Sequence, residues 1–116
     1  MSDSELREVM RQKSIGKAQK EDSLKGLLEV AKDFFADYFD IDHEFSFDEL
    51  YDEIQDSEIT SDTQKDRIRN FARKVTLVEY ADEDENLEGI RAEFLRLLTE
   101  LKKEAPAQEK RGLFSG

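Results

Sequence analysis

The chain of 116 residues contains no cysteine and no tryptophan, and it has only one histidine and one proline. The absence of cysteine excludes disulfides, thiolate nucleophiles, zinc–thiolate sites and iron–sulfur clusters. No GxSxG motif, HExxH motif or glycine-rich phosphate loop is present, so nothing supports nucleophilic, metallopeptidase or nucleotide chemistry. The sequence therefore predicts a protein that is not an enzyme and that uses no cofactor.

Long hydrophobic runs are also missing. No segment reaches the ~18 consecutive apolar residues of a membrane-spanning helix. The N-terminal stretch MSDSELREVM lacks the apolar centre of a signal peptide. We therefore expect a soluble, cytoplasmic protein, and a chain of this length suits one domain.

Acidic residues outnumber basic ones by 29 to 18, which gives a net charge of −11. Phosphate backbones and anionic membranes repel such a surface, so nucleic acid is an improbable partner unless a local basic patch compensates. Basic proteins and cations are easier partners. The simplest interpretation is that the charge keeps the domain soluble.

The region 24–41, LKGLLEVAKDFFADYFDI, carries the strongest periodic pattern. Its apolar residues recur at steps of three and four, so they form one continuous stripe on a helix. Burying a large apolar side chain contributes about 1.5–3 kcal/mol, and this helix can thus supply much of a core. We interpret its aromatic residues as packing and not as a ligand pocket. The stripe consists of Leu24, Leu27, Leu28, Ala31, Phe34, Phe35, Tyr38 and Phe39.

Capping signals place three further helices in the rest of the chain. Ser46 and Glu49 form one capping box, and Ser61 and Gln64 form a second. Asn86 can cap a last helix, and helically spaced apolar residues follow each of these starts. The sequence predicts an all-α fold, a small bundle of four core helices at about 23–40, 47–56, 62–80 and 87–104.

The two ends of the chain are expected to lie outside this core. Residues 1–22 are polar and charge-balanced, and Gly16 interrupts the helical pattern soon after Lys13. We expect a frayed helix or a tether there, followed by the helical domain at 23–104. The remaining residues, 105–116, are expected to form a disordered tail.

Two features are candidates for binding a protein partner. Lys65, Arg69 and Arg73 repeat at four-residue steps in the third predicted helix, so they share one face. That face can dock an acidic partner, or it can pair with the acidic segment that precedes it. In the tail, Leu113 and Phe114 form an apolar pair of the kind that docks in a groove.

An acidic turn near residue 82 partly matches a calcium-binding loop. Asp82, Asp84 and Asn86 occupy alternate positions, and Glu93 stands at position twelve, as in an EF-hand. Position six is Leu87, where that loop uses glycine for its sharp turn. The match is therefore incomplete, and a solvated turn that caps the next helix is the simpler interpretation.

A second acidic cluster surrounds the only histidine, His43. A histidine among carboxylates can titrate near neutral pH or bind a cation. No second ligand stands at helical spacing from it, so we expect an exposed loop histidine whose pKa is shifted by its neighbours. The acidic residues of this cluster are Asp40, Asp42, Glu44 and Asp48.

Over about 80 residues the chain resembles a known helical module. The segments that carry the resemblance are FSFDELYDEI, VEYADED and LEGIRAEFLRLLTELK. Their counterparts occur in the module on the cytosolic side of the last membrane span of BatD-type aerotolerance proteins and related membrane proteins. The resemblance implies a compact interaction or scaffold module and no chemistry. The matching positions are Ser46–Leu50, Glu79–Ala81 and Leu87–Leu101.

These observations leave three functions open. The leading hypothesis is a non-enzymatic protein-interaction or adaptor module, associated with a membrane complex. The first alternative is a calcium- or cation-responsive acidic domain that uses the turn near residue 82. The second alternative is a small regulator of a nucleic-acid complex, acting through Lys65, Arg69 and Arg73. The sequence does not define the oligomeric state.

Overall fold

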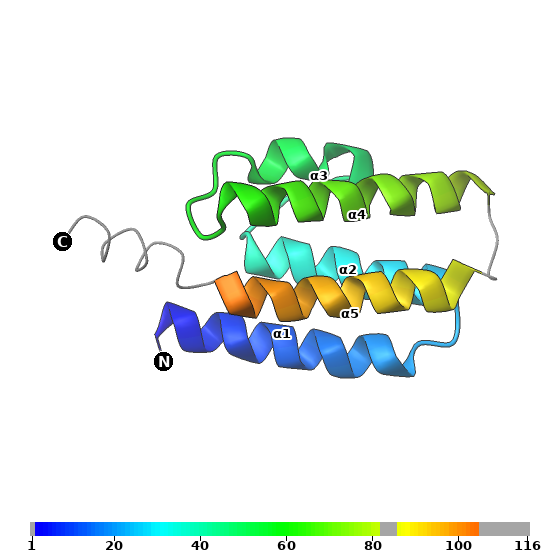
Figure 1. Ribbon diagram of the computed structural model, residues 1–116, viewed down its shortest axis with the longest axis horizontal. Coiled ribbons are helices and arrows are strands. Elements are labelled where there is room, and N and C mark those ends of the chain that lie inside the picture. The colour runs from blue at the N-terminus through cyan, green and yellow to red at the C-terminus, as the bar shows by residue number, and fades with distance from the viewer. Residues whose placement is uncertain (1, 82–85, 105–116) are drawn as a thin grey trace.

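The computed structural model describes residues 2–81 and 86–104. Within these residues the chain forms helices and no strand (Figure 1), so the predicted all-α fold is confirmed. The four predicted core helices are present, each with its ends within two residues of the expected bounds. A further helix precedes them. The helices are α1 (Asp3–Lys20), α2 (Leu24–Tyr38), α3 (Phe47–Ile54), α4 (Asp62–Ala81) and α5 (Leu87–Glu104).

Both predicted capping boxes are formed. The Ser46 hydroxyl accepts the Glu49 backbone N–H at 3.3 Å, and the Glu49 carboxylate accepts the Ser46 backbone N–H at 2.9 Å. At the start of α4, the Ser61 hydroxyl accepts the Gln64 N–H at 3.2 Å, and the Gln64 side-chain oxygen accepts the Ser61 N–H at 2.9 Å. These bonds satisfy backbone donors that have no partner inside the helix, which fixes where α3 and α4 begin.

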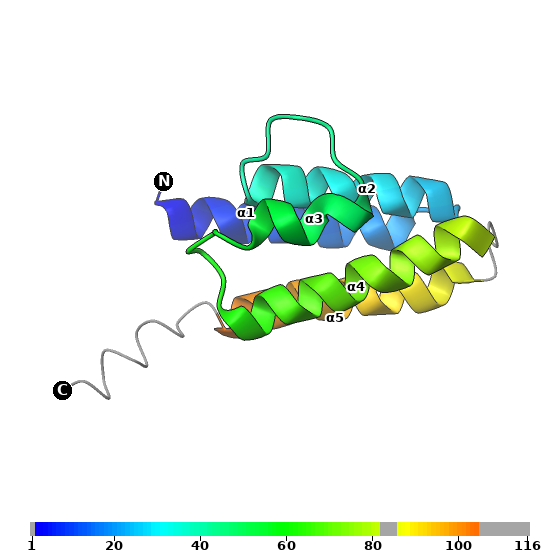
Figure 2. The ribbon, with the colours of Figure 1, turned by 90° about the horizontal axis from the view of Figure 1, so that it is seen from above.

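The helices pack as two groups that share α5. Helices α1, α2 and α5 contact one another, while α3 lies along α4 and α4 lies along α5. Figure 1 shows α1 and the α3–α4 pair on opposite sides of α5, and Figure 2 shows α4 and α5 forming a layer beneath the other helices. Helix α3 is short, so it covers only part of the length of α4.

Aromatic rings from four helices meet in the centre of the bundle. Phe35 of α2 lies 6.2 Å from Phe71 of α4 and 6.3 Å from Phe94 of α5, measured between ring centroids. Phe47 of α3 lies 6.3 Å from Phe71. Phe34 is 2% exposed and Phe35 is fully buried, so the interpretation of these rings as packing is confirmed.

The N-terminal region differs from the prediction. Ser2 and Glu5 form a capping box, and α1 then runs through Gly16 to Lys20 without a break. A helix is therefore present, as one of the two expected forms, but it is neither frayed nor interrupted at Gly16, and a tether is wrong for this segment. A single glycine weakens a helix by only about 1 kcal/mol relative to alanine, and packing against α2 and α5 offsets that cost.

The signal for this packing was weak because the inward side chains of α1 are small or polar. Arg11, Ser14 and Ala18 are buried, and hydrophobic periodicity does not mark such residues as core. The Arg11 guanidinium is paired with Glu8 and donates to the Leu98 carbonyl of α5 at 3.5 Å. Burial lowers the pKa of Arg11, which remains charged because its ordinary value is so high.

Arg91 of α5 holds the other end of α1. Its guanidinium donates to the Ala18 carbonyl at 2.6 Å and to the Glu21 carbonyl at 2.8 Å. Glu88 accepts from the same guanidinium and orients it. The last carbonyls of a helix lack partners inside the helix, so Arg91 acts as a C-terminal cap supplied from another part of the chain.

Candidate interaction surface

Two of the three predicted basic residues line a groove between α3 and α4. The groove has a volume of about 240 Å³, and both helices contribute aromatic, small and charged side chains to it. It is lined by Phe47, Asp48, Tyr51, Asp52, Arg69, Ala72, Arg73 and Thr76. Two of the three predicted cations, Arg69 and Arg73, therefore belong to one surface, whereas Lys65 lies beyond its end.

Lys65 is used by the fold. Its ammonium donates to the backbone carbonyl of Gln55 at 2.8 Å, and Gln55 is the C-terminal cap of α3. A cation at this position satisfies an exposed carbonyl and also interacts favourably with the negative end of the helix dipole. Lys65 thus attaches the end of α3 to the start of α4, and a partner would have to compete for it.

Arg69 forms one wall of the groove. Its guanidinium carbon lies 5.1 Å from the centre of the Tyr51 ring, within the range of a cation–π contact. It also pairs with Asp66, one turn earlier, at 3.5 Å. Its Nε atom is buried and makes no hydrogen bond with the part of the chain that the structure describes. Arg69 is therefore held in place but keeps one unused donor.

Arg73 and Leu77 continue the same row of four-residue steps toward solvent. Arg73 is exposed and has no ion pair or hydrogen bond with any described residue. Leu77 is 71% exposed, more than any other large hydrophobic side chain in the described residues. Leu77 lies outside the candidate face predicted from the sequence, although its spacing from Arg73 was a readable signal.

The candidate calcium ligands are only partly visible. Asp82 and Asp84 lie outside the described residues. Glu93 pairs with Lys74 of α4 at 3.0 Å and with Arg96 at 3.9 Å, so its carboxylate already has cationic neighbours. Among the described residues, no group of three or more histidine, aspartate and glutamate side chains is arranged to hold a metal ion.

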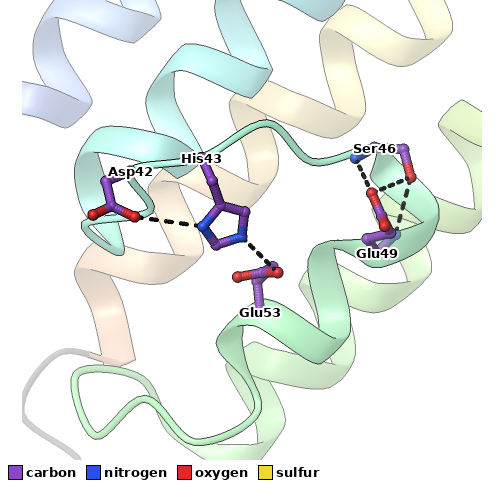
Figure 3. Close-up of polar contacts among 5 residues, drawn as sticks. All are labelled: Asp42, His43, Ser46, Glu49 and Glu53. Atoms are coloured by element: carbon purple, nitrogen blue, oxygen red, sulfur yellow. Dashed lines mark hydrogen bonds and ion pairs between the residues drawn. The ribbon is translucent and has the colours of Figure 1, made fainter.

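His43 lies in the loop between α2 and α3, as expected, and joins that loop to α3 (Figure 3). Its Nε2 atom is 2.9 Å from the Glu53 carboxylate, and its Nδ1 atom is 3.4 Å from that of Asp42. The hydrogen bond to Glu53, and secondarily that to Asp42, raises the pKa of His43, because both contacts favour the imidazolium form. Glu53 stands outside the acidic cluster considered from the sequence.

The remaining tail candidates, Leu113 and Phe114, lie in the part of the chain that is not described. No helix in the described ranges is both long enough and apolar enough to cross a membrane. Comparison with protein-family models, with curated proteins and with solved structures finds no significant match for the chain. The candidate surface therefore has to be interpreted from its own chemistry.

Proposed function

We propose that the protein is a non-enzymatic interaction module that binds an acidic, partly apolar segment of a partner protein along α4. The single observation that carries the proposal is the pair Arg73 and Leu77. An exposed cation with no partner among the described residues stands one turn before the most exposed large apolar side chain. The adjacent groove adds Tyr51 and Arg69, the residue types that concentrate binding energy in interfaces.

The charge of helix α4 favours an acidic partner, whereas Asp48 and Asp52 line the α3 side of the groove. Helix α4 carries five basic and three acidic residues, in a chain whose net charge is −11. An acidic segment can pair with Arg73 and Arg69, and it is repelled by most of the remaining surface, which restricts how it docks. The nucleic-acid alternative lacks this support, because Lys65 is engaged with Gln55 and the total charge opposes phosphate.

A displayed library of random peptides tests the chemistry of this surface. We expect the full chain to select peptides that combine aspartate or glutamate with leucine or phenylalanine. The double variant Arg73→Glu and Leu77→Asp should lose about ten-fold or more in affinity for them. Selection of neutral or basic peptides, or equal binding by the double variant, would overturn the proposal.

Matched controls separate this surface from general charge effects. Arg96→Glu changes an exposed cation of α5, and Leu6→Asp changes an exposed apolar residue of α1 that is 45% exposed. Both controls should bind the selected peptides like the unmodified chain. The same variants can be used to capture partners from cell extract. Recovery of a membrane complex with the unmodified chain but not with Arg73→Glu would support the adaptor role.

A further inference from the structure

Helix α1 covers an apolar face of the bundle with a mixed one, in which the larger apolar residues Met10 and Ile15 are only partly buried. Its best-buried side chains are Arg11, Ser14 and Ala18, whereas Leu6 and Val9 are 45% and 40% exposed. An amphipathic helix in a bundle normally shows the opposite arrangement. Local rules of this kind are most often broken where a second function competes with stability.

The packing beneath α1 is correspondingly incomplete. A cavity of about 80 Å³ lies between α1 and α2, which otherwise pack directly against each other. Its apolar walls come from Met10 of α1 and from Val30 and Phe34 of α2, and Ser14 faces them with a short, polar side chain. A larger apolar residue at this position would fill space that α1 leaves empty, so the face of α2 is suited to a more apolar helix than the one it holds.

Side chains of opposite charge on α1 and α2 line this cavity. Lys13 and Lys17 of α1 line the same cavity as Asp33 and Asp37 of α2. Helix α1 contains five basic and three acidic residues, so its net charge is +2, and the other residues of the chain together carry −13. The helix is thus attracted to an acidic body, and its last turn is capped by Arg91.

We propose that α1 is a displaceable cover and that the face beneath it, on α2 and α5, binds a cationic amphipathic helix of another protein. Such a helix would place lysines on the cavity that Asp33 and Asp37 line, as α1 does, and large apolar side chains where α1 has Arg11 and Ser14. Helix α1 lies on the other side of the bundle from the α3–α4 pair (Figure 1), and the face beneath it takes a partner of opposite charge. It is independent of the proposed function of α4.

Competition of this kind is energetically accessible. Because α1 is tethered by only a few residues, its effective concentration over the face is high, of the order of millimolar. A competing helix therefore needs contacts that α1 does not make, and buried leucines in place of Arg11 and Ser14 provide them. The observed affinity then equals the intrinsic affinity multiplied by the small fraction of molecules in which α1 has left the face.

The test is an NMR titration of the isotope-labelled full chain with a synthetic peptide. The peptide has the sequence of residues 3–20 with the substitutions Arg11→Leu and Ser14→Leu. We expect resonances of α2 and α5 to shift while the amides of α1 lose their protection from hydrogen exchange. A peptide that also carries Lys13→Glu and Lys17→Glu should bind about five-fold or more weakly.

Two variants of the protein should move the peptide's affinity in opposite directions. Ser14→Met fills the cavity under α1 and should weaken peptide binding, because the cover is held more tightly. Lys13→Glu with Lys17→Glu in the protein loosens the cover and should strengthen binding. No binding at millimolar peptide, binding with α1 still protected, or equal affinity in the two variants would each overturn the proposal.

Discussion

At the scale of single residues, the most consequential contact is one that joins distant parts of the chain. Arg91 caps α1 from α5 through two backbone carbonyls, and only 14% of its side chain is exposed. Hydrogen bonds that involve a charged group contribute about 1.5–3 kcal/mol. The value of this contact therefore exceeds that of any exposed ion pair on the surface.

We predict that Arg91→Met lowers the free energy of unfolding by about 1.5–3 kcal/mol, because it leaves the Ala18 and Glu21 carbonyls without their donor. Urea denaturation measures this change. Arg96→Met is the matched control, since Arg96 is 67% exposed and lies 3.9 Å from Glu93, and it should cost less than about 0.5 kcal/mol. Equal losses in the two variants would contradict the capping role.

His43 gives the chain a pH-dependent contact. Because the folded state raises the pKa of His43 above its ordinary value, the imidazolium stabilises the fold below the ordinary value of 6.5. That contribution is lost as the pH rises through the folded-state pKa. We therefore predict that the stability difference between the protein and His43→Gln is largest at acidic pH and disappears at alkaline pH.

A titration of the His43 resonances identifies the cause of the shift. In Glu53→Gln the pKa of His43 should fall toward its ordinary value, because the largest stabilising contact is gone. Asp42→Asn should lower the pKa less, since its contact is longer, 3.4 Å against 2.9 Å. A pKa that does not change in Glu53→Gln would refute this assignment.

At the scale of elements, glycines offer a direct test of helix continuity. A Cβ atom added at Gly16 of α1 or at Gly89 of α5 would meet no atom within 4 Å. Gly16→Ala and Gly89→Ala should therefore each stabilise the protein by about 0.5–1 kcal/mol, the usual gain from restricting the unfolded chain and improving helix propensity. A destabilising Gly16→Ala would mean that α1 is interrupted there.

Gly26 of α2 provides the contrasting case. A Cβ atom there would collide with the Glu21 carboxylate, so the Glu21 side chain must move. That side chain is long and flexible, and the gain in helix propensity should be reduced but not reversed. We therefore expect the free energy of unfolding of Gly26→Ala, measured in urea in the same way, to be lower than that of Gly16→Ala and of Gly89→Ala.

The helices differ in how far the sequence could predict them. Helix α2 was predictable because large apolar side chains at helical spacing are almost uniquely explained by burial. Helix α1 was not, since Arg11 and Ser14 become core residues only through Leu98 and α2, which tertiary packing supplies. Short-range capping boxes were readable, whereas the contact between Arg91 and Ala18 spans 73 positions and leaves no local trace.

At the scale of the whole molecule, the candidate site was likewise only partly predictable from the sequence. Spacing alone placed Lys65, Arg69 and Arg73 on one helix face. It could not predict which of the three already has a partner, because those partners lie at and after the end of α3 or on α3 itself. Lys65 donates to the Gln55 carbonyl, and Arg69 lies over the Tyr51 ring. Arg73 lines the same groove as Asp48 and Asp52 of α3 but forms no ion pair or hydrogen bond with a described residue. Leu77 becomes a candidate only once its exposure is known.

The uneven charge of the molecule leads to a last prediction about salt. Raising the ionic strength from 0.01 M to 0.15 M shortens the screening length from about 30 Å to about 8 Å. Repulsion within the acidic body, which carries −13 outside α1, is then screened, so global stability should rise. The attraction between α1 and that body is screened as well, so local opening of α1 should become easier.

Native-state hydrogen exchange resolves these two effects residue by residue. Between the two salt concentrations, the opening free energies of α2, α4 and α5 should increase while those of α1 decrease, each by up to about 1 kcal/mol. In Lys13→Gln with Lys17→Gln, the response of α1 should shrink, because the charges that face Asp33 and Asp37 are gone. If salt moves α1 and the core in the same direction, then charge does not hold the cover, and its attachment must come from Arg91 and from packing alone.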